Sequence, residues 1–171
     1  MKYTHLKGIV LPWVIEQGLK LKGTREIVGP RHNPVILAWG REVGLGNVYT
    51  NDEIPWCGLF VAVVAQRAKK AIVSKPLWAR NWSKFGVKVD RAGLGDVLVF
   101  KRGNGSHVGF YIAEDATCYH VLGGNQNNTV NIMRIAKNRT LSIRRPIYNN
   151  QPKSVKPYYV AANGIVSINE A

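Results

Sequence analysis

Cys57 stands where a turn-rich loop meets an apolar, helix-forming segment, a position that suits a nucleophilic thiol. A thiol attacks only as the thiolate, and the free amides of a helix's first turn stabilise that anion. Gly58 follows directly, so a substrate could approach without meeting a Cβ, and backbone amides there could form an oxyanion hole. The alternative is a buried structural cysteine, which is also the ordinary role of Cys118 in the strand-like run 117–122. Cys57 is therefore the candidate nucleophile.

His107 is the best placed of the four histidines to act as the base that a thiol requires. It opens an expected strand directly after the turn 103–106. A strand end on a rigid sheet is a suitable mount for a group that must meet Cys57 in space. His5 and His32 lie among turn or helix-start residues, where we expect solvent-exposed side chains.

The base needs a third polar group on its other ring nitrogen, and two residues compete for that position. Asn125 lies in the glycine-containing block 122–126, whereas His120 lies inside the preceding strand. Side chains alternate along a strand, so an unbroken strand would place these two residues on opposite faces. The two glycines between them allow a break, and alternation therefore leaves both open. The alternative for Asn125 and Gln126 is a simple turn.

Three residues that flank the expected nucleophile and base are candidates for substrate binding: Trp56, Gly58 and Ser106. Sugars and peptides dock on flat apolar faces near a cleft, which is the reason to consider Trp56. Its alternative role is to wedge the helix start into the core. The sequence contains no spacing typical of metal ligands, so we predict neither a metal nor a cofactor.

The first third of the chain is expected to be helical and to position Cys57. Apolar residues recur at helical spacing over 12–22, and the Asn-Pro pair at 33–34 is typical of a helix start. The segment 57–70 is apolar almost all round at its beginning and basic at its end. This pattern indicates a helix inserted end-first into a core. A shorter helix is predicted over 76–85, with a proline in its first turn and a glycine after its end.

Beyond residue 95 the pattern changes to short β-rich runs, over 95–101, 107–112, 117–122 and 129–135. Helices followed by strands predict an α+β domain, and the short connections predict an antiparallel sheet. The 171 residues fit a single domain. We place its core at about 13–146 and expect the extension 147–171 to form an added strand or a loosely held tail.

The chain is strongly basic, because 24 Lys and Arg against ten Asp and Glu give a formal net charge of +14. Such a charge attracts nucleic acid, anionic envelope polymers and anionic membrane surfaces alike. A basic cluster in the second half is predicted to be a solvated face: Lys137, Arg139, Arg144, Arg145, Lys153 and Lys156. The apolar run 8–15 is interrupted by Pro12 and lacks a cleavage site, so we predict no export signal. No run approaches the roughly twenty apolar residues of a membrane span.

Five short blocks, taken in order, resemble the CHAP and NlpC-type cysteine peptidase superfamily. They are Pro55-Trp56-Cys57, Arg80-Asn81-Trp82, the run 95–100, the run 106–109 and the run 122–126. The chain is similar, over about 13–146, to a branch of small bacterial and phage proteins with these blocks in this order. Any one block is weakly specific, but five in order are strongly specific.

The resemblance implies a papain-like fold and a metal-free catalytic triad. Cys57 matches the nucleophile, His107 the base, and Asn125 the orienting residue of CHAP-type members. Many CHAP members carry an acid two residues before this Asn, where the present chain has Gly123. NlpC-type members often use a second histidine, which would favour His120.

The resemblance also implies hydrolysis of an amide bond in bacterial peptidoglycan, by an N-acetylmuramoyl-L-alanine amidase or an endopeptidase. We expect a monomer that acts in the cell wall or periplasm, made in the cytoplasm and released by lysis or by a dedicated delivery system, as an endolysin or a lytic effector. Its basic face would approach anionic envelope polymers or the membrane surface, with no specific nucleic acid as partner. The alternatives are a basic nucleic-acid-binding module, or the same fold acting as an acyl transferase or a non-catalytic wall binder.

Overall fold

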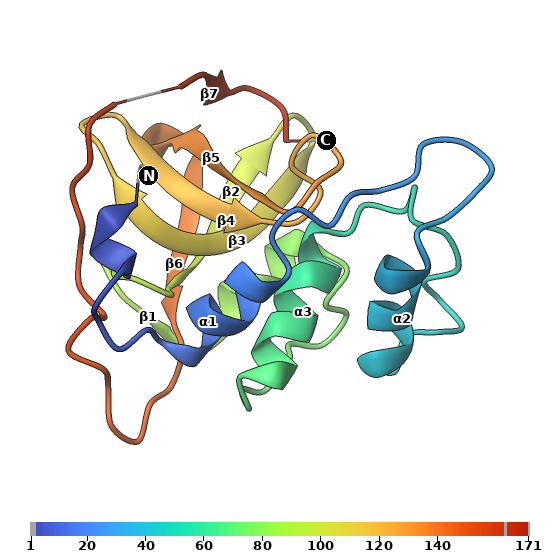
Figure 1. Ribbon diagram of the computed structural model, residues 1–171, viewed down its shortest axis with the longest axis horizontal. Helices are drawn as coiled ribbons and strands as arrows, with labels where there is room; N and C mark the ends of the chain where they lie inside the picture. The colour runs from blue at the N-terminus through green and yellow to red at the C-terminus, as the bar shows by residue number, and fades with distance from the viewer. Residues whose placement is uncertain (1–2, 163, 171) are drawn as a thin grey trace.

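The computed structural model describes residues 3–162 and 164–170, and its helices α1 and α3 pack against a seven-stranded sheet (Figure 1). The helices are η1 (Thr4–Leu6), α1 (Trp13–Lys20), α2 (Pro34–Glu42), α3 (Cys57–Arg67), η2 (Ala79–Lys84) and η3 (Lys137–Arg139), where η marks a 3-10 helix. The strands are β1 (Val87–Lys88), β2 (Val97–Arg102), β3 (Gly105–Glu114), β4 (Cys118–Gly123), β5 (Asn131–Ala136), β6 (Thr140–Arg145) and β7 (Val166–Ser167). The α+β class predicted from the sequence is confirmed.

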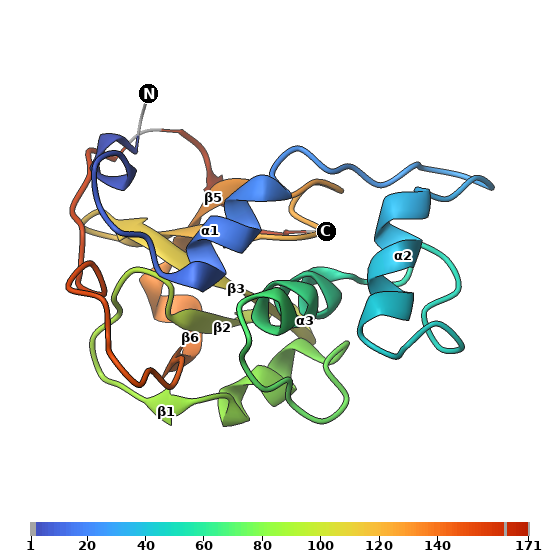
Figure 2. The same ribbon diagram turned by 60° about the horizontal axis from the view of Figure 1, so that its bottom comes forward.

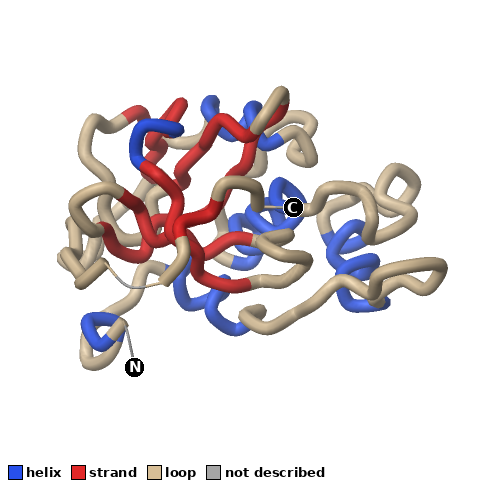
Figure 3. Tube along the Cα trace, turned by 90° about the horizontal axis from the view of Figure 1, so that it is seen from above, coloured by secondary structure: helices blue, strands red, loops and turns tan. Residues whose placement is uncertain are grey.

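The sheet has the strand order β1-β6-β2-β3-β4-β5-β7, and Figure 3 shows its strands gathered apart from α2. All neighbours from β1 to β5 are antiparallel. At the edge, however, β7 runs parallel to β5, with Ile135 opposite Ser167. The chain reaches β7 by the long segment 146–165, which hydrogen-bonds to Glu114 on its way along the sheet. The sheet is therefore mixed, and the prediction of an antiparallel sheet is wrong at this edge.

Helix α3 carries Cys57 into the core. The nine residues from Cys57 to Ala65 are all buried, because the helix packs against β3 on one side and between α1 and α2 on the others (Figure 2). A helix that is buried on all sides needs apolar residues all round, and the sequence shows this pattern over the first turns of α3. At the exposed end, Arg67 binds Glu42 of α2 through two hydrogen bonds of 2.8 and 2.7 Å.

Two further helix predictions have different outcomes. Asn33 caps α2, because its side-chain oxygen accepts a hydrogen bond of 2.8 Å from the Val35 amide. The helix predicted over 76–85 is instead a 3-10 helix that begins at Ala79. The Trp82 indole donates to the carbonyl of Pro76 at 2.9 Å, so a side chain takes an acceptor that an α-helix would have offered to a backbone amide. Within the described ranges, no helix has the length and apolar character needed to cross a membrane.

Part of the basic cluster is structural and not a solvated face. Arg144 donates to the carbonyls of Phe85 and Gly86 at 2.5 and 2.9 Å. Arg145 binds both carboxylate oxygens of Asp96, at 2.9 and 2.8 Å, and that carboxylate is fully buried. These arginines hold β6 and the segments beside it together, because their donors end on buried acceptors.

Candidate active site

Cys57 is the first residue of α3, and its side chain is buried with 2% of the residue exposed. Burial is the largest influence on the thiol and raises its pKa above the ordinary value of 9.0. The positive charge of Arg102 and hydrogen bonds from the Val108 and Gly58 amides act in the opposite direction. Since α3 packs against β3 and the Val108 amide of β3 acts on the thiol, Cys57 lies beside the strand that carries His107.

His107 is fully buried in β3, opposite Phe100 of β2. Its Nε2 lies 3.1 Å from Oε1 of Gln126, which can only accept, so Nε2 carries the proton and donates. In the neutral ring the lone pair is then on Nδ1. Nδ1 is buried and finds no hydrogen-bond partner among the described residues. This nitrogen is thus available to take a proton from a thiol or a substrate.

Gln126 is itself held in one orientation. Its side-chain nitrogen donates to the carbonyl of Val121 at 3.2 Å and to two oxygens of Asn131, both at 2.9 Å. Because these partners are acceptors, the amide oxygen must face His107, and the ring is fixed in the tautomer with its proton on Nε2.

The structure corrects the predicted third member of the site. Asn125 was expected to orient His107, but its backbone has a φ of 54° in the turn after β4, and its buried side-chain oxygen has no partner within the described chain. His120 binds Asp115 through Nε2 and Tyr3 through Nδ1, both at 2.9 Å, so both of its ring nitrogens are taken. Gln126 makes the contact that was predicted for either of them.

Of the three predicted substrate-binding residues, two are packed against the protein itself. Trp56 is fully buried, and its indole nitrogen donates to Glu26 at 2.8 Å. Its ring lies so close to Gly124 that a Cβ there would be 2.8 Å away. The ring is part of the core, which is the alternative role given for it above, and it offers no exposed face for a substrate to dock on.

The space left by the missing side chain of Gly58 is occupied by a loop of the protein itself and not by a substrate. A Cβ at this position would collide with the carbonyl of Pro76 and would lie 2.9 Å from that of Leu77. The absent side chain was expected to let a substrate approach, but the chain that approaches is the protein's own backbone. Ser106, in contrast, is partly exposed next to His107, and its binding role stays a prediction.

The two histidines expected to be solvated also have structural partners. His5 stacks on Tyr158 with ring centroids 4.5 Å apart, and its Nε2 lies 3.1 Å from the carbonyl of Ile112. His32 lies 2.8 Å from Asp52, a fully buried carboxylate in the loop before Cys57. Burial acts to raise the pKa of Asp52, but the hydrogen bonds it accepts outweigh this effect and lower the pKa.

Three charged residues near His107 were not identified as site residues from the sequence. Burial is the main cause that lowers the pKa of His107 to about 4; the charge of Glu170 opposes this, whereas Arg102 and Arg139 reinforce it. Glu170 lies 63 positions (170 − 107) from His107 in the sequence. No local spacing could have signalled this contact, because it depends on the path of the chain after β6.

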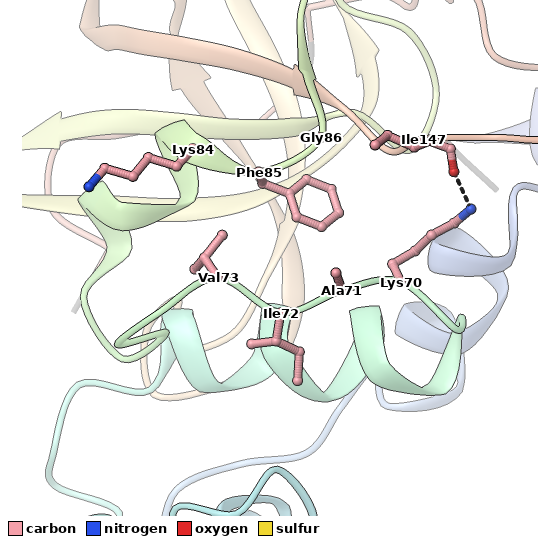
Figure 4. A pocket seen from close by; sticks show the side chains of 8 residues that line it. All are labelled: Lys70, Ala71, Ile72, Val73, Lys84, Phe85, Gly86 and Ile147. Carbon is pink, nitrogen blue, oxygen red and sulfur yellow. Dashed lines mark hydrogen bonds between the residues drawn. The ribbon is translucent and has the colours of Figure 1, made fainter.

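A separate hollow of about 180 Å³ lies beside the segment that follows α3, between residues 70–73 and Phe85 (Figure 4). It is lined by residues 70–73, 84–86 and Ile147, and the ammonium group of Lys70 donates to the Ile147 carbonyl beside it. Its lining is largely apolar and does not include Cys57 or His107. The hollow therefore offers no nucleophile and base for attack on an amide.

Comparison with known proteins finds no matching family model, no matching curated protein and no matching solved structure. The geometry of Cys57, His107 and Gln126 is therefore the basis for inferring function.

We predict that Gly58→Ala destabilises the fold by about 1–3 kcal/mol, because the new methyl group must displace the backbone at Pro76 and Leu77. Urea unfolding measures the loss. Gly105→Ala is the control, since the nearest atom to its new Cβ is 3.6 Å away. A Gly58→Ala protein as stable as the wild type would contradict the close packing of α3 on this loop.

We also predict that stability depends on pH through His107. Its pKa is about 4 in the folded protein and 6.5 as an ordinary value, so between these values the unfolded chain binds a proton that the folded site does not. The free energy of unfolding therefore rises with pH across this window, by up to about 3 kcal/mol.

Urea unfolding at pH 4.5 and pH 7 tests this, with His107→Gln as the comparison. The variant should lose most of the pH dependence and keep the smaller part that comes from His5, whose pKa is also lowered by burial. An unchanged pH dependence in His107→Gln would show that another group is responsible.

Proposed function

We propose that this protein is a cysteine-dependent amidohydrolase in which Cys57 is the nucleophile, His107 the base and Gln126 the residue that orients the base. The observation that carries the proposal is the bond between His107 Nε2 and the Gln126 side chain. It leaves the other ring nitrogen with a lone pair, on the strand against which the Cys57 thiol packs. A nucleophile, a base and an oriented third group are the parts of a cysteine hydrolase.

In the proposed reaction, His107 Nδ1 takes the proton of Cys57 as the sulfur attacks the carbonyl carbon of the scissile amide. The tetrahedral oxyanion is placed to receive hydrogen bonds from amides at the start of α3. The imidazolium returns the proton to the leaving amine as the C–N bond breaks. A water molecule, deprotonated by His107, then attacks the thioester and releases the acid and the free thiol.

For the substrate, we propose an amide bond in the stem peptide of bacterial peptidoglycan. The five ordered blocks that resemble the CHAP and NlpC-type superfamily support this choice, and so does the α+β arrangement with a cysteine at a helix start. On this proposal the fold is papain-like and the protein is an N-acetylmuramoyl-L-alanine amidase or an endopeptidase that acts in the bacterial wall.

The alternative of a nucleic-acid-binding module rests on the net charge of +14. Three arginines of the basic cluster weaken it, because Arg139, Arg144 and Arg145 bind carboxylates and carbonyls of the chain itself. An acyl transferase would use the same nucleophile, and a wall binder would use none. Mass spectrometry of products from purified cell wall separates these cases and identifies the bond that is cut.

We predict that Cys57→Ala lowers the rate of wall hydrolysis by roughly 10³-fold or more, because the variant lacks the proposed nucleophile. Turbidity loss of permeabilised cells measures the rate. Cys118→Ala is the matched control: Cys118 is also buried, at 1% exposure, but lies in β4 away from the helix start. If Cys57→Ala cleared the walls as fast as Cys118→Ala, the proposed function would be wrong.

We predict that Gln126→Ala lowers kcat/KM and moves the acid limb of its pH profile to lower pH. The reason is that the Gln126 side chain raises the pKa of His107, so its loss lowers that pKa. Asn125→Gly is the control, because glycine keeps the left-handed backbone at this position. The acid limb should not move in the control. A shift in Asn125→Gly but not in Gln126→Ala would return the orienting role to Asn125.

A further inference from the structure

Glu170 places a fully buried carboxylate beside the candidate site, and Arg139 holds it with two hydrogen bonds. Two guanidinium nitrogens of Arg139 donate to the two carboxylate oxygens, both at 2.8 Å. The same guanidinium donates to the carbonyl of Ser167 at 3.0 Å and to that of Lys101 at 2.9 Å. Since Lys101 lies in β2, next to the strand of His107, Arg139 is anchored to the hairpin that carries the candidate base.

The segment 164–170 packs on the turn that carries Gln126. The Asn127 amide donates to the carbonyl of Glu170 at 2.9 Å, and Asn127 directly follows the residue that binds His107. In Figures 1 and 2 the red chain after β7 ends beside the loop between β4 and β5, at the end of the molecule where α3 begins.

The candidate site has more positive than negative charge around it. Arg102 and Arg139 both act on His107, and Arg102 acts on Cys57 as well. One terminal nitrogen of Arg102 is buried without a partner in the part of the chain that the structure describes. The carboxylate that acts on the same imidazole is that of Glu170. Without Glu170, the site would be suited to bind an anion.

The site is closed in this conformation, because Cys57 is 2% and His107 0% exposed. A polymeric substrate can reach them only if part of the protein moves. The segment 164–170 is the best candidate: its strand β7 has two residues, and Ile165 and Ile168 are 92% and 91% exposed. With so little apolar burial, its attachment depends largely on hydrogen bonds and on the ion pair, so it opens more readily than the core.

We infer that Arg139 forms a carboxylate-binding subsite and that Glu170 is its internal ligand, so that residues 164–170 close the site until a carboxylate of the substrate replaces Glu170. The substrate class is then an amide whose scissile bond lies close to a free carboxylate, a conclusion that rests on the proposed function. Exchange of one carboxylate for another is favoured because opening removes both carboxylate bonds of Arg139 and leaves its partly buried charge only the neutral Lys101 carbonyl among the acceptors named above.

Alkylation of Cys57 by iodoacetamide tests the closure without any substrate. In Glu170→Ala we expect Cys57 to react about tenfold faster than in the wild type, while buried Cys118 reacts at an unchanged rate. Peptide mass spectrometry follows both thiols in one sample. Glu42→Ala is the matched control, because it also removes the carboxylate of a two-bond pair with an arginine. Equal rates for Cys57 in Glu170→Ala and wild type, or equal acceleration of both cysteines, would overturn the inference.

Chemical rescue tests the subsite. Propionate carries the carboxylate that Glu170→Ala removes, so added propionate should slow Cys57 alkylation in this variant again. Propionamide, which has the same shape without the charge, should not. Protection should also be lost in the double variant Glu170→Ala/Arg139→Gln. Protection that persists in the double variant, or that propionamide gives equally, would overturn the assignment of Arg139.

Hydrolysis measured in the same proteins distinguishes a failure of the proposed function from a failure of the proposed closure. We expect Glu170→Ala to clear walls faster than the wild type at limiting enzyme. If Glu170→Ala opens Cys57 but neither protein cuts any amide, the proposed function fails and the closure stands. If both cut walls at the same rate and Cys57 is equally slow to alkylate in both, the proposed function stands and the closure fails.

Discussion

The packing of α3 against β3 is the constraint on which the candidate site depends. It places the helix that begins with Cys57 against the strand that carries His107, although the two residues are fifty positions apart (107 − 57). Two missing side chains also let neighbouring loops pack closely on the helix start: Gly58 faces the backbone of Pro76 and Leu77, and Gly124 faces the ring of Trp56. These contacts leave little freedom to the helix start, so the position of the thiol is set by the core and not by a flexible loop.

The same burial sets the electrostatic state of the pair. It raises the pKa of Cys57 and lowers that of His107, so both are neutral near pH 7 in the closed conformation. Attack by sulfur needs the opposite arrangement, with a thiolate beside an imidazolium. Water would move both pKa values in that direction, because it solvates the charged form of each group. Closure by residues 164–170 therefore has two opposed effects on His107: exclusion of water lowers its pKa, and the carboxylate of Glu170 raises it.

The sequence predicted the parts of the structure that depend on local patterns. The apolar surface of 57–65, the cap at Asn33 and the four longer β-rich runs each follow from periodicity or from one residue's backbone preference. It failed where one atom's partner decided the outcome. The Trp82 indole binds the carbonyl of Pro76 ahead of a 3-10 helix where an α-helix was predicted, and Gln126, not its neighbour Asn125, is the partner of His107. Adjacent amides in one turn cannot be told apart by spacing.

Contacts between residues far apart in the sequence could not be predicted from any local pattern, and these contacts have the greatest consequence for the site. In the sequence, Arg139 resembles any other member of a basic cluster. In the fold, the chain after β6 pairs with β5 as β7, and Glu170 then binds Arg139. A solvated arginine would contribute to general attraction of polyanions, whereas an arginine with a buried carboxylate has a defined ligand geometry. The charge of this protein thus acts in two ways: part of it builds the fold, as at Arg145, and part of it gives the candidate site its preference for a carboxylate.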